Sequence, residues 1–241
     1  MNIYTITAET PSKENNLKRR SNIFEKYYIP HLIKLDIFKK WDKCIELWCG
    51  QWHKLQKLIN NFPEVEFSWL EKSEVMLSKA KEKLLNIEVK KWDILNLSNL
   101  NQAYDIIFLS QVLHHLDEKD RKDAYKEIFK KLKNGWYIII IDSFRPESSV
   151  IKQKIWDITN RFYAVLSQYP ISSLGERLNH AINSILVPDF YNPEDFWYFS
   201  PERNNVLWWE NQELTLLHTI TPKIFQNTIP CISDMLIYQK L

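Results

Sequence analysis

The stretch YDIIFLSQVLHHLDEKDRKDAYKEIFKKLKNGWYIIIID (104–142) decides the fold. It contains two short apolar runs, at residues 106–109 and 138–141, and a segment with helical apolar spacing (118–133) lies between them behind Asp117. Continuous apolar strands are buried on both faces, which is typical of parallel sheets covered by helices. The stretch therefore predicts a strand–helix–strand unit of a parallel α/β sheet.

The same alternation of β-rich runs and helical patterns extends upstream to about residue 43, and two further β-rich runs lie near the end of the chain. Helices are expected through Leu55, Leu58 and Ile59 and over residues 73–85, where Ser73 is the expected N-cap. Strands alternating with helices of this length indicate a doubly wound sheet. The predicted fold class is α/β, with a mostly parallel, seven-stranded sheet. Its strands are expected at 43–48, 65–71, 87–91, 104–110, 136–142, 214–220 and 231–241.

The sequence divides into four segments around this sheet. Residues 1–40 form a predicted N-terminal helical cap with a break at Pro30, and residues 41–146 form the core. Residues 147–212 are a helical and aromatic insert after the fifth strand, and residues 213–241 supply the closing strands of the same domain. Because ligands bind at the carboxyl ends of strands in open α/β sheets, the insert is expected to act as a lid over a substrate.

Composition excludes several classes of protein. Lys+Arg 32 against Asp+Glu 30 leaves a formal net charge of +2, so a nucleic-acid partner is not expected. The polar N-terminus has no signal-peptide pattern, and the longest apolar run, 137–141, is too short to span a bilayer, so no membrane partner is expected. Cys44, Cys49 and Cys231 form no C-x-x-C pair, so neither a metal site nor a disulfide framework is indicated. We expect a cytoplasmic monomer or homodimer.

Carboxylates stand at the ends of the first three predicted strands. Glu46 and Glu71 end the first and second, and Asp93 follows the third. The carboxyl ends of parallel strands share one edge of a sheet, so these side chains are expected to converge on a common crevice. Converging carboxylates repel one another unless they face hydroxyls, amines or a cation. The sequence therefore predicts a ligand that carries such groups.

These motifs resemble those of class I S-adenosylmethionine-dependent methyltransferases, over a little under half of the chain (41–145). The resemblance implies a Rossmann-like methyltransferase fold, S-adenosyl-L-methionine as the cofactor and a small-molecule methyl acceptor. Four segments carry it: ELWCGQW (46–52) is similar to the glycine-rich first motif, LEKSEVMLSKAKEKL (70–84) to the second, WDILNL (92–97) to the segment at the adenine, and residues 110–142 to the region from strand four to strand five.

The resemblance also implies roles for individual residues. Glu46 would lie near the methionine end of the cofactor, Glu71 would accept the ribose hydroxyls, and Asp93 would accept the adenine amino group. Ile94 would pack on the adenine ring, while Gln111 and Val112 would lie beside the sulfonium. The remaining cofactor-binding residues implied by the first two motifs are Trp48, Cys49, Gly50, Trp52, Lys72 and Met76.

Tryptophan stands where this family has glycine. The chain has 3 glycines and 10 tryptophans, whereas average usage would give about 17 glycines. Glycine in such loops permits positive φ and a close backbone approach to the ligand, which an indole does not. Two indoles at 48 and 52 would fill the space of the methionine and ribose groups. Six tryptophans occupy family glycine positions: Trp41, Trp48, Trp52, Trp69, Trp92 and Trp136.

One hypothesis explains this placement. Some bacterial lineages read the UGA codon as glycine, whereas the commoner reassignment reads it as tryptophan, and translation with the wrong table converts glycine to tryptophan. The hypothesis is that the six positions are glycine in the cell, while Trp156, Trp197, Trp208 and Trp209 are undecided. If residues 48 and 52 are tryptophan in the cell, the sequence favours a non-catalytic binding module with the methyltransferase fold.

Methyl transfer from a sulfonium requires mainly positioning of the reactants and exclusion of water. A base is needed only if the acceptor loses a proton in the transition state. The candidate catalytic residues are His114, His115 and Asp142, at the ends of the fourth and fifth strands. The acceptor atom stays open between O, N and C, and an RNA methyltransferase is a further alternative. A nucleotide-dependent oxidoreductase is disfavoured because the chain contains no Tyr-x-x-x-Lys pair.

Overall fold

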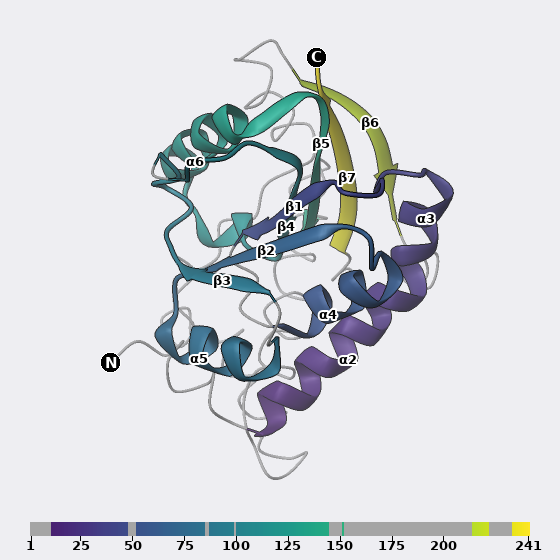
Figure 1. Cartoon of the computed structure of the whole chain (residues 1–241), viewed down its shortest axis with the longest axis vertical. Coiled ribbons are helices and arrows are strands. Elements are labelled where there is room, and N and C mark those ends of the chain that lie inside the picture. The colour runs from purple at the N-terminus through teal and green to yellow at the C-terminus, as the bar shows by residue number, and fades with distance from the viewer. Residues whose placement is uncertain are drawn as a thin grey trace.

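The computed structural model describes residues 11–47, 52–84, 87–98, 100–144, 151, 214–221 and 233–241. These residues form one seven-stranded sheet with helices on both faces (Figure 1). The strands are β1 (Lys43–Leu47), β2 (Glu66–Glu71), β3 (Glu88–Lys91), β4 (Tyr104–Ser110), β5 (Leu132–Ser143), β6 (Leu214–Ile220) and β7 (Ser233–Lys240). The helices are α2 (Pro11–Tyr27), α3 (Ile29–Lys34), α4 (Trp52–Asn61), α5 (Glu74–Lys83) and α6 (Glu118–Lys131), with a short 3-10 helix, η1 (Leu113–His115).

The strand order in the sheet is β3-β2-β1-β4-β5-β7-β6. Strands β1 to β5 pair in parallel, and β7 pairs antiparallel with both β5 and β6. The predicted doubly wound, mostly parallel, seven-stranded fold is confirmed. Because β7 runs against its neighbours, its first residues lie at the same edge of the sheet as the carboxyl ends of the parallel strands.

Two apolar clusters sandwich the sheet. Every residue of β4 is buried, as the apolar run at 106–109 predicts. Alternate residues of the strand face opposite sides: Ile107 and Leu109 join a cluster with α6, whereas Ile106 and Phe108 join a cluster with α2, α4 and α5. Figure 1 shows α6 on one face of the sheet and α2, α4 and α5 on the other.

The N-terminal helices end before residue 40, where the predicted helical cap ends. Helix α2 ends at Tyr27 and α3 ends at Lys34, so the last six residues of that range are not helical. Pro30 lies in the first turn of α3, where its missing N–H costs no hydrogen bond, and the break precedes it at Tyr28. Phe24 anchors α2 to the sheet, with its ring 5.8 Å from that of Phe108 in an edge-on contact.

Strand β5 begins at Leu132, four residues before the predicted start. Leu132 pairs with Tyr104, and the register then shifts before Ile106 pairs with Tyr137. Gly135 lies within this irregular part with φ +80. The predicted start at 136 therefore corresponds to the point at which regular pairing with β4 begins.

The predicted insert, 147–212, lies outside the described residues except for Ile151. The proposed lid and the four domain boundaries therefore stay predictions. No helix within the described ranges is both long and apolar enough to cross a membrane.

Candidate functional site

The strand order places a topological switch point between β1 and β4. From β1 the chain proceeds outward through β2 and β3 on one side, whereas β4 and β5 lie on the other. In open α/β sheets, ligands bind outside the carboxyl ends of the strands at such a point. The predicted site residues Glu46, Glu71 and Gln111 lie at the ends of β1, β2 and β4, on this edge.

Glu71 is held at the start of α5. Its side chain is 0% exposed, and its Oε1 accepts a hydrogen bond from the backbone N–H of Ser73 at 2.7 Å. Ser73 caps the helix as predicted, since its Oγ accepts from the backbone N–H of Met76 at 3.5 Å. Glu71 thus lies beside the N-terminus of α5, where the helix dipole interacts favourably with negative charge. Glu46 is likewise 0% exposed, near the end of β1.

Asp93 lies one strand further out, in the turn after β3. Its Oδ1 accepts from the backbone N–H of Leu95 at 3.1 Å, and its Oδ2 pairs with Lys72 Nζ at 2.7 Å. The structure thus brings together the predicted residues Lys72 and Asp93. Ile94 is buried in the cluster beneath α6, so its contact with an adenine ring stays a prediction.

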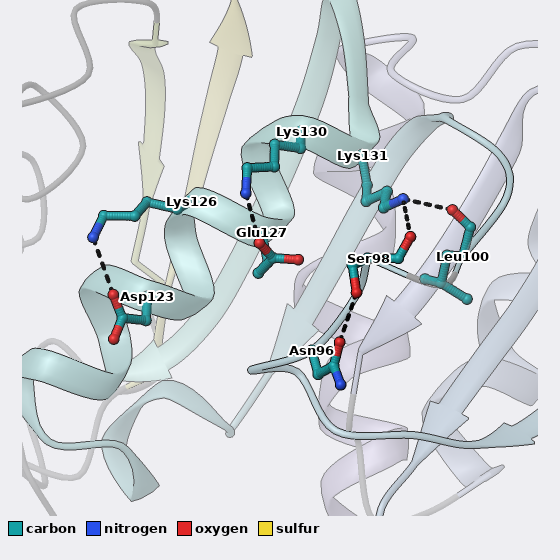
Figure 2. Close-up of polar contacts among 8 residues, drawn as sticks. All are labelled: Asn96, Ser98, Leu100, Asp123, Lys126, Glu127, Lys130 and Lys131. Carbon is teal, nitrogen blue, oxygen red and sulfur yellow. Dashed lines mark hydrogen bonds and ion pairs between the residues drawn. The ribbon is translucent and has the colours of Figure 1, made fainter.

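Helix α6 anchors the segment after β3 that carries Asp93 (Figure 2). Lys131, the last residue of α6, donates from Nζ to the carbonyl oxygens of Leu100 at 2.5 Å and Ser98 at 3.2 Å. Asn96 Oδ1 accepts from Ser98 Oγ at 2.8 Å within the same segment. The loop that bears the predicted adenine contact is therefore attached to a helix of the core. The other pairs drawn, Asp123 with Lys126 and Glu127 with Lys130, are i,i+3 ion pairs along the outer face of α6.

Gln111 marks the end of β4 with a left-handed backbone, φ +58. Its backbone N–H donates to Ile141 O at 2.8 Å, and its side-chain Nε2 donates to Ser233 Oγ at 2.8 Å. Val112 is buried in the core cluster beneath α6. The chain thus turns sharply after Ser110, and the Gln111 side chain links β4 to the first residue of β7.

His114 and Asp142 form a buried pair beside this turn. His114 Nδ1 lies 2.5 Å from Asp142 Oδ1, while Asp142 Oδ2 accepts from the backbone N–H groups of Leu113 at 3.0 Å and His114 at 3.3 Å. Both carboxylate oxygens therefore hold η1 against the end of β5. The ring of His115 lies 4.1 Å from that of His114. The structure brings the three predicted catalytic residues together, and it gives Asp142 contacts that stabilise the fold.

A group of polar residues at the start of β7 was not among the predicted site residues. Tyr28 O–H donates to Ser233 O, and Thr221 Oγ1 donates to Asp234 Oδ1 at 2.6 Å. Burial raises the pKa of the Asp234 carboxyl, and the Thr221 hydrogen bond lowers it in part. Burial and the nearby Asp234 charge raise the pKa of the Tyr28 phenol, which keeps its proton at neutral pH. The available signal was the polar start of the final β-rich run, Ser233 and Asp234.

Trp41 has a glycine-like backbone conformation. Its φ is +69, in the left-handed region that favours glycine, and its side chain is 67% exposed. Its backbone N–H donates to Glu64 O at 2.9 Å, so the turn itself is well ordered by hydrogen bonding. This conformation supports glycine at position 41.

The other described tryptophans at family glycine positions are in contact with the core. Trp69, in β2, is 0% exposed, and its indole N–H has no hydrogen-bond partner among the described residues. Trp52 begins α4 and packs against the cluster beneath that helix, with its ring 3.9 Å from that of His53. Trp92 and Trp136 pack against the cluster beneath α6. Trp48, Cys49 and Gly50 lie outside the described residues.

The hydrogen-bond acceptors at the carboxyl edge fit the chemistry of S-adenosylmethionine. Buried Glu46 and Glu71 offer oxygens to a ligand that carries hydroxyls and positive charge, and Asp93 offers a carboxylate to an exocyclic amine. No group of three or more His, Cys, Asp or Glu side chains in the described ranges could hold a metal ion.

Comparison with known proteins identifies the domain. A family model described as a methyltransferase domain matches residues 45–135, which contain the end of β1, β2 to β4, α4 to α6 and the predicted cofactor residues from Glu46 to Val112. Residues 45–135, a little over a third of the chain, are therefore similar to a methyltransferase domain. The sequence-based prediction of a methyltransferase agrees with this match. Comparison with curated proteins finds no match.

Solved structures show the same fold around this methyltransferase domain. The N-methyltransferase NodS from Bradyrhizobium japonicum WM9, in complex with S-adenosyl-l-homocysteine, is 11% identical with a TM-score of 0.55, over 96% of this chain and 89% of that one. A SAM-dependent methyltransferase from Methanosarcina mazei is 15% identical with a TM-score of 0.60, over 87% and 97%. An O-methyltransferase family protein from Burkholderia thailandensis is 12% identical with a TM-score of 0.57, over 92% and 60%. At these identities, the likeness establishes the Rossmann-like methyltransferase fold alone.

Proposed function

We propose that this methyltransferase moves a methyl group from S-adenosylmethionine to an O, N or C atom of a small-molecule acceptor. The observation that carries the proposal is the position of Glu71, a fully buried carboxylate at the end of β2 and the start of α5. An acid at the corresponding strand end accepts ribose hydroxyls in doubly wound dinucleotide-binding sheets. The formal net charge of +2 favours a small molecule over RNA as the acceptor.

Each residue of the edge has a role in this proposal. Glu71 accepts the two ribose hydroxyls, Asp93 accepts the adenine amino group, and Lys72 holds Asp93 in place through its 2.7 Å ion pair. Glu46 contributes negative charge near the cationic methionine end. The resemblance assigns Gln111 to the sulfonium side, and its hydrogen bond to Ser233 fixes that side chain between β4 and β7.

When bound, S-adenosylmethionine supplies an electrophilic methyl group, so the protein has to align the acceptor and exclude water. Asp142 holds η1 through both of its carboxylate oxygens, and we assign it to positioning the histidines. His114 and His115 are the candidate bases for an acceptor that loses a proton. The proposal includes glycine at positions 41, 48, 52, 69, 92 and 136, and the chain with these six glycines is called the glycine form below.

Titration calorimetry with S-adenosylmethionine tests the role of Glu71. In the glycine form, Glu71→Gln is expected to weaken binding at least about 10-fold, because a neutral amide replaces a charged acceptor of two hydroxyl hydrogen bonds. Glu74→Gln is the matched control, since Glu74 lies three residues away and pairs with Lys91 on the exposed surface. Equal affinity of the Glu71→Gln variant and its parent would contradict the assignment.

The acceptor class requires a separate assay. Transfer of a labelled methyl group into a protein-free metabolite extract, with and without added RNA, distinguishes the two acceptor classes. We expect label in small molecules that resist ribonuclease. Label only in RNA would overturn the proposed acceptor class while leaving the methyltransferase assignment intact.

A further inference from the structure

Asp234 lies at the carboxyl edge of the parallel strands although it belongs to the last strand of the chain. Strand β7 runs antiparallel to β5, and Asp234 pairs in register with Asp142. Directly opposed residues of an antiparallel pair point to the same face of the sheet, with Cβ atoms about 4.5–5.5 Å apart. The Asp234 side chain therefore lies on the face that carries the His114–Asp142 pair.

Hydrogen bonds on two sides fix the start of β7. Ser233 Oγ accepts from Gln111 Nε2 at 2.8 Å, and Gln111 is the residue that the proposed function assigns to the sulfonium side. Tyr28 O–H donates to the carbonyl oxygen of Ser233 and so attaches this residue to the N-terminal helices. Asp234 is the next residue along β7, so its half-buried side chain is held close to the position at which an acceptor approaches the sulfonium.

The two opposed carboxylates differ in how their charge is compensated. Asp142 accepts two backbone N–H groups and contacts the His114 ring. Asp234 Oδ1 accepts one hydrogen bond, from Thr221 Oγ1 at 2.6 Å, and no lysine, arginine or histidine in the described ranges pairs with it. Its other charged neighbour across the strand, Asp142, is also an acid. A positively charged ligand would compensate the Asp234 charge that its neighbours leave.

The Asp234 carboxylate opposes folding. Burial raises the pKa of Asp234 above its usual value, so the ionised side chain is less stable in the folded chain than in the unfolded chain. Asparagine would keep an acceptor for the Thr221 hydroxyl without this cost. A carboxylate that lowers stability at the edge where ligands bind therefore favours a role in ligand binding over a role in folding.

We propose that Asp234 binds a positively charged nitrogen of the methyl acceptor, which makes the acceptor a cationic small molecule such as an amine. This inference rests on the proposed function and narrows its acceptor class. A charge-assisted hydrogen bond from the ammonium group to the carboxylate selects cations over neutral and anionic molecules. Thr221 orients the carboxylate, and Asp234 takes no part in making or breaking bonds.

Selective depletion of a metabolite extract tests the charge of the acceptor. A protein-free extract is used untreated, after passage over a cation-exchange resin at pH 7, or after passage over an anion-exchange resin. The glycine form and labelled S-adenosylmethionine are then added. We expect label transfer in the untreated and anion-depleted extracts and its loss after cation depletion. Transfer that survives cation depletion would overturn the inference and leave the proposed function intact.

A pair of variants tests whether Asp234 is responsible. Asp234→Asn is expected to reduce transfer at limiting extract about 10- to 100-fold, the range for losing a hydrogen bond between charged groups, and to leave the S-adenosylmethionine affinity in calorimetry unchanged. This variant is expected to fold, because it removes a destabilising charge. Asp123→Asn, on the exposed face of α6, is the matched control and is expected to change neither quantity.

The outcomes separate this inference from the proposed function. Unchanged transfer by Asp234→Asn, or a loss of transfer that an equal loss of cofactor affinity accounts for, would overturn the role of Asp234 alone. Absence of label from small molecules in the untreated extract would overturn the proposed function and this inference with it.

Discussion

Trp41 offers the sharpest test of the glycine hypothesis within the described structure. With φ at +69, an L-residue at this position carries a cost of about 1–2 kcal/mol relative to a right-handed conformation. The side chain offsets little of that cost, because it is 67% exposed and its ring contact is with the Lys40 ammonium, 5.1 Å from the ring centroid. Trp41→Gly and Trp41→Ala remove the same ring, but only glycine relieves the backbone.

The difference in folding stability between these two variants has a predicted sign that can be measured. Glycine loses about 0.5–1 kcal/mol more conformational free energy than alanine on folding, so the midpoints of the two ranges leave Trp41→Gly more stable than Trp41→Ala by about 0.75 kcal/mol. For a chain of this size the difference corresponds to about 1–4 °C in Tm. Urea denaturation and thermal unfolding followed by circular dichroism measure it directly.

An ordinary helix position serves as the control. Lys126 is an exposed residue in the middle of α6, so Lys126→Gly is expected to be less stable than Lys126→Ala by about 1 kcal/mol, the reverse order. If Trp41→Ala equals or exceeds Trp41→Gly in stability, position 41 has no glycine preference and the reasoning from its φ is refuted.

Three further predictions concern stability. Asp142→Asn is expected to lower the free energy of unfolding by about 1.5–3 kcal/mol, because both charged oxygens accept buried hydrogen bonds, whereas Asp123→Asn on the exposed face of α6 changes it by less than about 0.5 kcal/mol in urea titrations. Ser73→Ala is expected to cost about 1 kcal/mol through loss of the α5 cap, measured in the same way. The pKa of Asp234 is raised in the folded state, so its ionisation lowers stability as pH rises above about 4; the Tm of Asp234→Asn relative to the parent is therefore expected to increase from pH 3 to pH 7.

Each of these predictions has a contradicting result. Equal stability losses for the two aspartate variants would mean that the His114–Asp142 pair does not stabilise η1. An unchanged free energy of unfolding in the Ser73→Ala variant would show that Ser73 does not stabilise α5 as a cap. A Tm difference between Asp234→Asn and the parent that is independent of pH would mean that the Asp234 carboxyl titrates as in the unfolded chain.

The central strands and helix α6 could be predicted because their signals are local. The apolar runs at 106–109 and 138–141 require burial on both faces, and Asp117 accepts the backbone N–H of Asp120 at 2.7 Å as an N-cap. The break near Pro30 was misplaced because proline is compatible with both a helix break and a helix start. The insertion of β7 between β5 and β6 depends on long-range pairing, which periodicity does not encode.

The same distinction between local signals and long-range contacts applies to the residues of the candidate site. Glu46, Glu71 and Asp93 were predictable because parallel strands share one carboxyl edge, so position along a strand determines position at the edge. The Gln111–Ser233 contact joins residues 122 positions apart, and it follows only from the placement of β7 in space. Asp142 was predicted as a catalytic candidate from its strand end, and its hydrogen bonds to η1 emerge only from the folded turn.

Calorimetry with S-adenosylmethionine on the glycine form and on the printed sequence tests the central claim most directly. The glycine form is expected to bind one cofactor per chain, and the printed sequence, in which Trp48 and Trp52 flank the first-motif loop, is expected to bind much more weakly. Absence of binding by a folded glycine form would contradict the claim that this edge of the sheet is the cofactor site.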